Sequence, residues 1–181
     1  MGWIVDQAHS SVEFIVRHMM ISKVRGRFLD FDGTLEIDEE NPRNSTLEGS
    51  IRVKSIDTGV EARDTHLRSG DFFAADTHPT IHFRASGITP KRDGEYEVRG
   101  DLTIKGTTRE LVWEVEEVGR GVDPYGNKKW AFEAETEFDR RDFGLDWNVP
   151  LEAGGVLVGN KVKVELTVQL QYQPVQDEVT E

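Results

Sequence analysis

The stretch Glu95-Tyr-Glu-Val-Arg-Gly-Asp-Leu-Thr-Ile-Lys105 decides the fold, because side chains along it alternate in character. Tyr96, Val98, Leu102 and Ile104 stand at every second position, with charged or hydroxyl residues between them. A two-residue period places successive side chains on opposite faces of a β-strand. The stretch therefore predicts a strand with one apolar face, about 35 Å long at about 3.3 Å per residue.

The same alternation recurs outward from this stretch in both directions. It is seen in segments 12–16, 31–37, 51–53, 81–85, 111–115, 132–138 and 162–170. One apolar and one polar face per strand is typical of antiparallel sheets, and long strands of this kind leave exposed edges unless the sheet closes on itself. We expect an all-β protein: a closed antiparallel β-barrel of about eight strands. Residues 1–173 would form one domain, and the acidic residues 174–181 a disordered tail.

One segment, Thr58–Phe73, breaks the alternation and predicts a short helix. Thr58 followed by Glu61 fits a capping box, and Gly70 fits a C-cap, so the helix would cover about 59–69. Four residues share one helical face at about 100° per residue: Val60, Arg63, Asp64 and Leu67. Charged groups beside an apolar stripe need partners or a polar ligand. We therefore expect this helix at the rim of a cavity.

Composition excludes several classes of function. The 181 residues carry a net charge of −12, which disfavours nucleic acid and anionic membrane surfaces as partners of the whole molecule. There is no cysteine, and no apolar run approaches the ~20 residues of a membrane-spanning helix. No signal peptide is visible, and the compartment stays open: the chain as given would be soluble and cytoplasmic. A leader trimmed from the chain would instead indicate a periplasmic or extracytoplasmic protein.

The histidines do not indicate a metal site. His78 and His82 are four residues apart, but Pro79 and the strand pattern place them about 13 Å apart in extended chain. No nucleophile motif is present either. We expect no metal, no cofactor and no enzyme activity. The alternative is a small-molecule enzyme that would use His18, His66 or Asp64 at the barrel mouth.

A basic group near the start of the chain stands out against the acidic whole. It consists of Arg17, Lys23, Arg25 and Arg27. Two interpretations stay open: a solvated edge of a strand and loop, or a basic mouth for an anionic group.

The order and spacing of short motifs resemble the YceI-like family of polyisoprenoid-binding proteins, which have an extended lipocalin-like barrel. The resemblance runs from Trp3 to about Tyr172. It rests on Asp6-x-x-His9-Ser10, Phe14-x-Val16-x-His18, Val24-x-Gly26-x-Phe28, Phe31-x-Gly33, Ser55-Ile-x-Thr58, Arg63-Asp-x-His66-Leu67-x-Ser69-x-Asp71-Phe72-Phe73, Pro79-x-Ile81-x-Phe83, Gly100-x-Leu102-x-Ile104-x-Gly106 and Arg140-Arg141-Asp142-Phe143-Gly144-Leu145.

The resemblance implies an elongated hydrophobic pore that binds an isoprenoid lipid, such as a polyprenyl diphosphate or an isoprenoid quinone, as carrier, store or sensor. A homodimer is plausible for a family of this shape. A stress-related scaffold that acts through protein partners is a further alternative. From their apolar register or position, thirteen residues are predicted to line the pore: Phe14, Val16, Val53, Phe72, Phe73, Phe83, Leu102, Ile104, Trp113, Phe132, Phe138, Val164 and Leu166.

The ligand's head group is expected at the rim, because a charge inside an apolar pore would be desolvated at great cost. The predicted rim residues are His18, Arg63, Asp64 and His66. Arg63 has two possible roles. It contacts the head group, or it is structural and pairs with Asp64 or Asp142.

Overall fold

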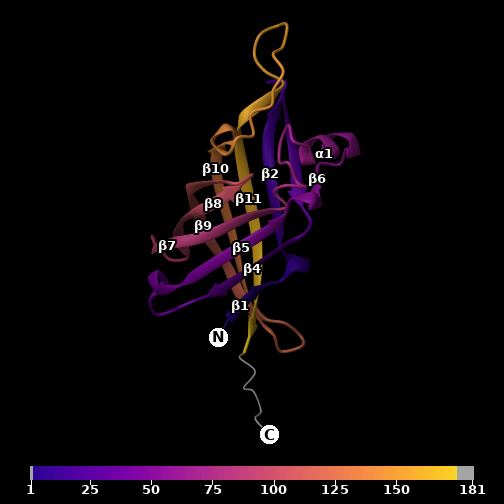
Figure 1. Ribbon diagram of the computed structural model, residues 1–181. Coiled ribbons are helices and arrows are strands. Elements are labelled where there is room, and N and C mark those ends of the chain that lie inside the picture. Colours follow the sequence, from indigo (N-terminus) through magenta and orange to yellow (C-terminus); the bar gives the residue numbers. More distant parts are fainter. Residues whose placement is uncertain (1, 175–181) are drawn as a thin grey trace.

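The computed structural model describes residues 2–174, which form an antiparallel barrel with one α-helix (Figure 1). The strands are β1 Gly2–Val5, β2 Ser11–His18, β3 Ser22–Phe28, β4 Phe31–Glu36, β5 Thr46–Arg52, β6 Ile56–Asp57, β7 Thr80–Pro90, β8 Glu95–Ile104, β9 Thr107–Val122, β10 Lys128–Asp139 and β11 Val158–Gln173. The helices are α1 Glu61–Arg68 and the 3₁₀ turns η1 Gln7–His9, η2 Pro42–Asn44, η3 Val53–Ser55 and η4 Arg140–Phe143.

Eight of these strands form a closed ring, as the sequence predicts. Their order is β1-β4-β5-β7-β8-β9-β10-β11, and β1 pairs with β11 to close it. The C-terminal part of β11 pairs with β1, with Leu170 opposite Val5. The N-terminal part of β11 pairs with β2, with Val158 opposite His18. Strands β2, β3 and β6 then extend the wall beyond the ring.

The molecule has two distinct ends, which Figure 1 shows at top and bottom. The end named here the helix end carries α1, the β2–β3 turn and the loop of residues 144–157 that precedes β11. The other, the terminal end, carries the start of β1, the end of β11 and the β9–β10 turn.

Asp6 organises the break between β1 and β2. Its carboxylate accepts hydrogen bonds from Lys129 Nζ at 2.9 Å and from the Ala8 amide at 3.2 Å, and lies 2.9 Å from His9 Nδ1. Its own amide donates to the Gln169 carbonyl at 2.8 Å. The Lys129 ammonium and His9 lower the pKa of Asp6 to about 2. This junction lets β1 pair with β4 while β2 pairs with β3.

Two apolar clusters hold the barrel. The larger includes Phe28, Ile56, Phe72 and Phe143 and lies toward the helix end. The smaller is built on Trp3, Trp130 and Leu170 at the terminal end, where Trp3 meets Trp130 edge to face at 5.3 Å. Tyr172 also meets Trp3 edge to face, at 5.4 Å.

The predicted helix exists, but its predicted caps are wrong. It begins at Glu61 after Val60, which gives no side-chain cap, and it ends at Arg68 with Ser69, not Gly70, as its C-cap residue. The Thr58 hydroxyl donates to Asp64 Oδ1 at 2.6 Å instead of capping the helix. Because Gly59 has a φ of 83°, the chain turns sharply between Thr58 and the helix.

Candidate functional site

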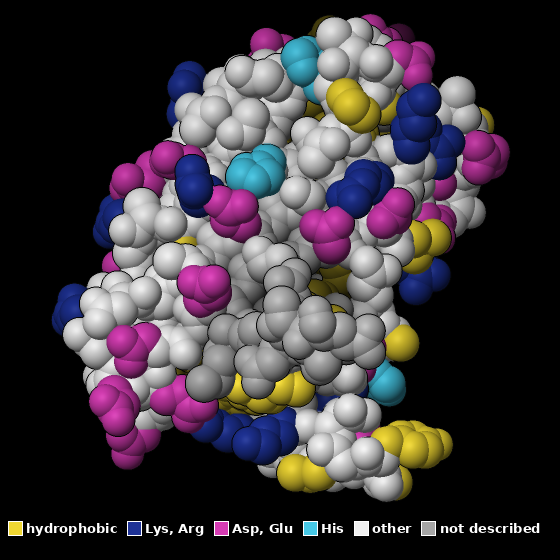
Figure 2. Space-filling view, turned by 60° about the horizontal axis from the view of Figure 1, so that its bottom comes forward, with side chains coloured by type: hydrophobic (Ala, Val, Ile, Leu, Met, Phe, Trp, Pro, Cys, Tyr) yellow, Lys and Arg dark blue, Asp and Glu magenta, His cyan; other side chains and the backbone are white. Residues whose placement is uncertain are grey.

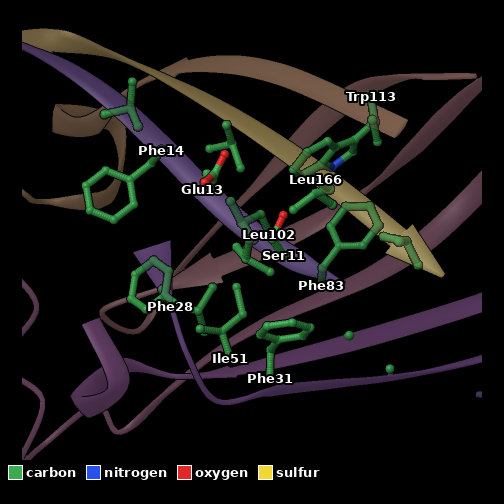
Figure 3. Close-up of a pocket in the computed structure, with 18 of the residues that line it drawn as sticks. Ser11, Glu13, Phe14, Phe28, Phe31, Ile51, Phe83, Leu102, Trp113 and Leu166 are labelled. Atoms are coloured by element: carbon green, nitrogen blue, oxygen red, sulfur yellow. The ribbon is translucent and has the colours of Figure 1, made fainter. Parts of the chain in front are cut away.

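The barrel encloses a cavity of about 750 Å³ whose wall is almost entirely apolar (Figure 3). This volume lies within the range of natural small-molecule sites, about 300–1,000 Å³. The cavity is elongated, since its lining follows β11 through Val158, Val162, Val164, Leu166, Val168 and Leu170. From Val162 to Leu170, every second residue of β11 thus faces inward, as the strand period requires.

The structure places every residue predicted for the pore on this wall except Val53. Phe14, Phe83, Leu102, Trp113 and Leu166 come from five different strands and converge on the same space (Figure 3). Val53 instead lies in η3 and is buried in the larger apolar cluster, outside the cavity. The alternation of segment 51–53 ends there because the chain leaves the strand after Arg52.

Two glycines make room for wall aromatics. A Cβ on Gly26 would overlap the ring of Phe14, which lies opposite it in register. A Cβ on Gly100 would overlap the Phe83 ring and the Arg84 carbonyl oxygen. These glycines let large rings lie flat against the sheet, so that the space beyond them stays open.

Sequence reasoning left further wall residues without a role. They include Phe28, Phe31, Tyr96, Val98, Trp130 and Trp147. The strand members share the alternation that identified their neighbours, so the signal was present for them. Trp147 lies in the loop of residues 144–157, where no period operates.

The helix end collects polar groups beside the apolar wall. His18, Arg63 and His66 all line the cavity there. His66 Nε2 lies 2.9 Å from Asp71 Oδ2, and its ring meets Trp147 edge to face at 4.5 Å. The ring is thus fixed by a carboxylate on one side and an indole on the other.

Arg63 forms neither of the two ion pairs considered for it. Its Nε donates to the Thr58 hydroxyl oxygen and its Nη2 donates to the Thr58 carbonyl, both at 2.7 Å. Asp142 is exposed in η4. Within residues 2–174 no carboxylate forms a direct ion pair with Arg63, which is linked to Asp64 only through the Thr58 hydroxyl.

Asp64 does not lie at the rim as predicted. It is 4% exposed and is absent from the cavity wall. The Thr58 amide donates to its Oδ1 at 2.9 Å, and the Thr58 hydroxyl donates to the same oxygen. Asp64 therefore fixes the start of the helix rather than contacting a ligand.

Arg140, given no role from the sequence, is the structural centre of the helix end. It is 3% exposed and donates to the carbonyls of Leu145, Trp147, Val158 and Gly159 and to Asn160 Oδ1. Burial lowers the pKa of its guanidinium. Because all five N–H groups are used, Arg140 holds the loop against β11 and has no donor left for a ligand.

The terminal end carries a different polar pair. The Arg120 guanidinium stacks 3.7 Å above the Trp130 ring and bonds Glu39 at 2.7 Å. Trp130 and Leu170 of the smaller apolar cluster line the cavity beside this pair, as do Arg120 and Glu39 themselves.

The described residues set limits on other chemistry. Among residues 2–174, no group of three or more histidine, aspartate and glutamate side chains is placed to hold a metal ion. None of the helices in this part of the chain is long and apolar enough to cross a membrane.

Comparison with known proteins agrees with this architecture. A UPF0312 protein of Staphylococcus aureus (strain N315) is 39% identical over 165 residues, 91% of this chain and 94% of that protein. Burkholderia cenocepacia BcnA superposes with a TM-score of 0.79 at 24% identity, over 91% of this chain and 98% of that one.

A second solved structure, a polyisoprenoid binding domain from Saccharophagus degradans implicated in plant cell wall breakdown, superposes with a TM-score of 0.67. It is 13% identical and covers 94% of this chain and 98% of that domain. Both solved structures show the shared fold alone. The model of the YceI-like domain matches residues 3–170, nearly the whole chain. This chain therefore belongs to the YceI-like family.

Proposed function

We propose that this protein binds an isoprenoid or similar long-chain amphiphile in its barrel, as a carrier, store or sensor. A polyprenyl diphosphate and an isoprenoid quinone are the ligand classes that fit. The observation that carries the proposal is the elongated apolar cavity of about 750 Å³ with polar groups at the helix end. The polyisoprenoid binding domain from Saccharophagus degradans, which has the same fold, supports the choice of ligand.

Energetics favour a ligand with a long apolar chain. Burying apolar carbon stabilises a complex by about 0.8 kcal/mol per methylene, so ten carbons would contribute about 8 kcal/mol before association costs. The wall supplies this contact from several aromatic rings, among them Phe14, Phe83 and Phe132.

The orientation follows from the two ends. The tail would point toward the smaller apolar cluster, and the head group would stop at the helix end, where Arg63, His18 and His66 line the opening. Arg63 keeps a charge without a carboxylate partner, so a diphosphate or a quinone oxygen can accept a hydrogen bond from it.

An enzyme that uses Asp64 with His66 fits the geometry poorly. Asp64 is buried and bonded to Thr58, whereas His66 bonds to Asp71 and packs against Trp147. The two side chains thus serve separate local contacts, and binding is the better-supported function.

A matched pair of variants on β10 tests the proposal. Ala134 lines the cavity, whereas Ala131 is not part of its wall. Ala134→Trp should obstruct the cavity and weaken binding of farnesol and farnesyl diphosphate, measured by isothermal titration calorimetry. Ala131→Trp should bind both like the parent, and native mass spectrometry of the parent from cells should show an apolar adduct.

Two outcomes would overturn the proposal. One is equal binding of farnesol by the parent and by folded Ala134→Trp, because the cavity would then not be the site. The other is a parent that binds neither isoprenoid probe and carries no adduct.

A further inference from the structure

The helix end carries an exposed apolar projection that the binding proposal leaves without a role. The β2–β3 turn exposes Met19 by 42%, Met20 by 57% and Ile21 by 80%, and the neighbouring loop exposes Val149 by 41%. We name these four residues the tip. Figure 1 shows the loop of residues 144–157 as the outermost feature of this end. Water-exposed methionine and isoleucine side chains side by side mark an interaction surface.

The backbone of the turn adds a second observation. Met19 has a φ of 52° and Met20 a φ of 65°, a region in which turns favour Asn and Gly. Two methionines there lower the stability of the hairpin relative to Asn-Gly. Folding therefore does not explain these side chains, and their exposure leaves them available to a partner.

The tip is continuous with the cavity. The Met19 amide donates to the Leu157 carbonyl at 2.8 Å, and a Cβ on Gly155 would lie 3.2 Å from Met20 Cγ. Leu157, which accepts this hydrogen bond, and His18, which precedes Met19 in the chain, both line the cavity. A surface that covers the tip would therefore lie against the opening.

The β2–β3 hairpin at this end carries a local excess of positive charge. Residues 14–29 contain four basic residues and no acidic one, in a chain of net charge −12. Arg17 and Lys23 face each other across β2 and β3, and neither forms an ion pair within residues 2–174. Asp146 and Glu152, on the loop of residues 144–157, carry the opposite charge. The attraction to an anionic surface would therefore come from the β2–β3 hairpin.

We propose that the tip docks on an anionic lipid bilayer, with Met19, Met20 and Ile21 inserted among the lipid chains and with Arg17 and Lys23 at the head groups. Interfacial membrane anchors have the same composition, apolar side chains flanked by cations. Docking would present the helix end of the cavity to the membrane. Only this use rests on the proposed function, since docking itself needs no ligand in the cavity.

Flotation of the full chain with vesicles tests the proposal. Vesicles of phosphatidylcholine with phosphatidylglycerol should carry the parent protein at low ionic strength, and vesicles of phosphatidylcholine alone should carry much less. The double variant Met19→Asn with Met20→Gly removes the apolar side chains and suits the positive φ of the turn, so it should stay folded. We expect its partition coefficient to fall by about tenfold or more.

Three further variants make the result specific. Lys23→Gln should weaken binding to the anionic vesicles about fivefold, the effect of one cation near a membrane surface. Tyr125→Asn, in the β9–β10 turn at the terminal end, removes a side chain that is 90% exposed and should float like the parent. Ala134→Trp should also float like the parent, which separates docking from ligand binding.

The proposal fails if the double variant floats as well as the parent. It also fails if the parent does not float; a dimer in sedimentation velocity that the double variant loses would then mean that the tip joins two copies of this chain. Loss of isoprenoid binding with intact flotation would contradict only the proposed function.

Discussion

At the scale of single residues, the start of α1 depends on a buried carboxylate that has no cationic partner within residues 2–174. Thr58 gives Asp64 both its amide and its hydroxyl. The hydroxyl oxygen also accepts from Arg63 Nε. One hydroxyl thus links the buried acid to the cation at the cavity opening, and its removal leaves Asp64 short of a donor.

We therefore predict that Thr58→Val lowers the free energy of unfolding by about 1–3 kcal/mol, the cost of an unsatisfied buried polar group. Urea denaturation measures the change. Thr65→Val, an exposed residue of the same helix, is the matched control and should change stability by less than about 0.5 kcal/mol. Equal effects of the two variants would show that the hydroxyl of Thr58 contributes nothing specific.

A second residue, Asp6, predicts a pH dependence. Its pKa is lowered from 3.8 to about 2 by Lys129 and His9, and its side chain is only 15% exposed. A carboxyl with a lowered folded-state pKa stabilises the protein above its unfolded pKa and loses that effect as pH falls from about 4 to about 2. The contribution at neutral pH is about 2 kcal/mol.

Asp6→Asn should accordingly reduce stability by about 2 kcal/mol at pH 7 and by much less near pH 2. Urea unfolding of the parent and the variant across this range gives the comparison. A difference between the two proteins that stays constant with pH would assign the effect of Asp6 to its neutral hydrogen bonds alone.

Prediction from the sequence is weakest at this residue scale. Thr58 and Glu61 have the spacing of a capping box, yet Gly59 turns the chain and directs Thr58 to Asp64. Arg140 shows the same difficulty, because its acceptors are backbone carbonyls from Leu145 to Gly159. Carbonyl oxygens are present at every residue, so no side-chain pattern reveals which of them gather around a buried cation.

At the scale of elements, prediction succeeded because the two-residue period is a property of the strand itself. The inward-facing residues of β11 and β8 line the cavity, among them Val164, Leu166, Leu102 and Ile104. The period fails where a strand ends, as at Val53. It also cannot supply strand order, and the split pairing of β11 with β1 and β2 came from the structure.

Close approach of the strands leaves no room for a side chain at one glycine of β8. At Gly100 an added Cβ would overlap the Arg84 carbonyl oxygen, and backbone of a paired strand cannot move aside as a side chain can. Gly100→Ala should therefore lower the free energy of unfolding by about 1–3 kcal/mol. Gly49→Ala in β5 is the control, since its Cβ would meet nothing closer than 3.7 Å. Thermal denaturation that ranks the two variants in the reverse order would contradict this explanation.

At the scale of the whole molecule, the outer face of the barrel concentrates negative charge. Five residues are successive direct partners across five neighbouring strands: Glu97, Glu114, Glu135, Glu165 and Glu13. Lysines and arginines between them form ion pairs, among them Lys91 with Glu114 at 2.9 Å. In Figure 2, acidic side chains are also prominent on the terminal end. An anionic bilayer would thus repel the barrel wall, and the basic hairpin that carries the tip would be the part of the molecule that approaches the bilayer.

A neighbouring row lacks such compensation, and it yields the last prediction. Glu116 of β9 lies directly opposite Glu95 on one side and Glu133 on the other, and none of the three forms an ion pair within residues 2–174. Like charges in direct cross-strand positions destabilise a sheet by about 0.2–1 kcal/mol. Glu116→Gln should therefore raise the free energy of unfolding by about 0.5 kcal/mol at low ionic strength.

Salt distinguishes this repulsion from a change in packing. At about 1 M salt the Debye length falls to about 3 Å, so the gain from Glu116→Gln should vanish. Glu114→Gln, which also removes a charge but breaks the contact with Lys91, should give a smaller gain or none. Urea unfolding of the three proteins at low and high salt makes the comparison. A stabilisation by Glu116→Gln that persists in high salt would mean that the side chain, and not its charge, sets the strain between these strands.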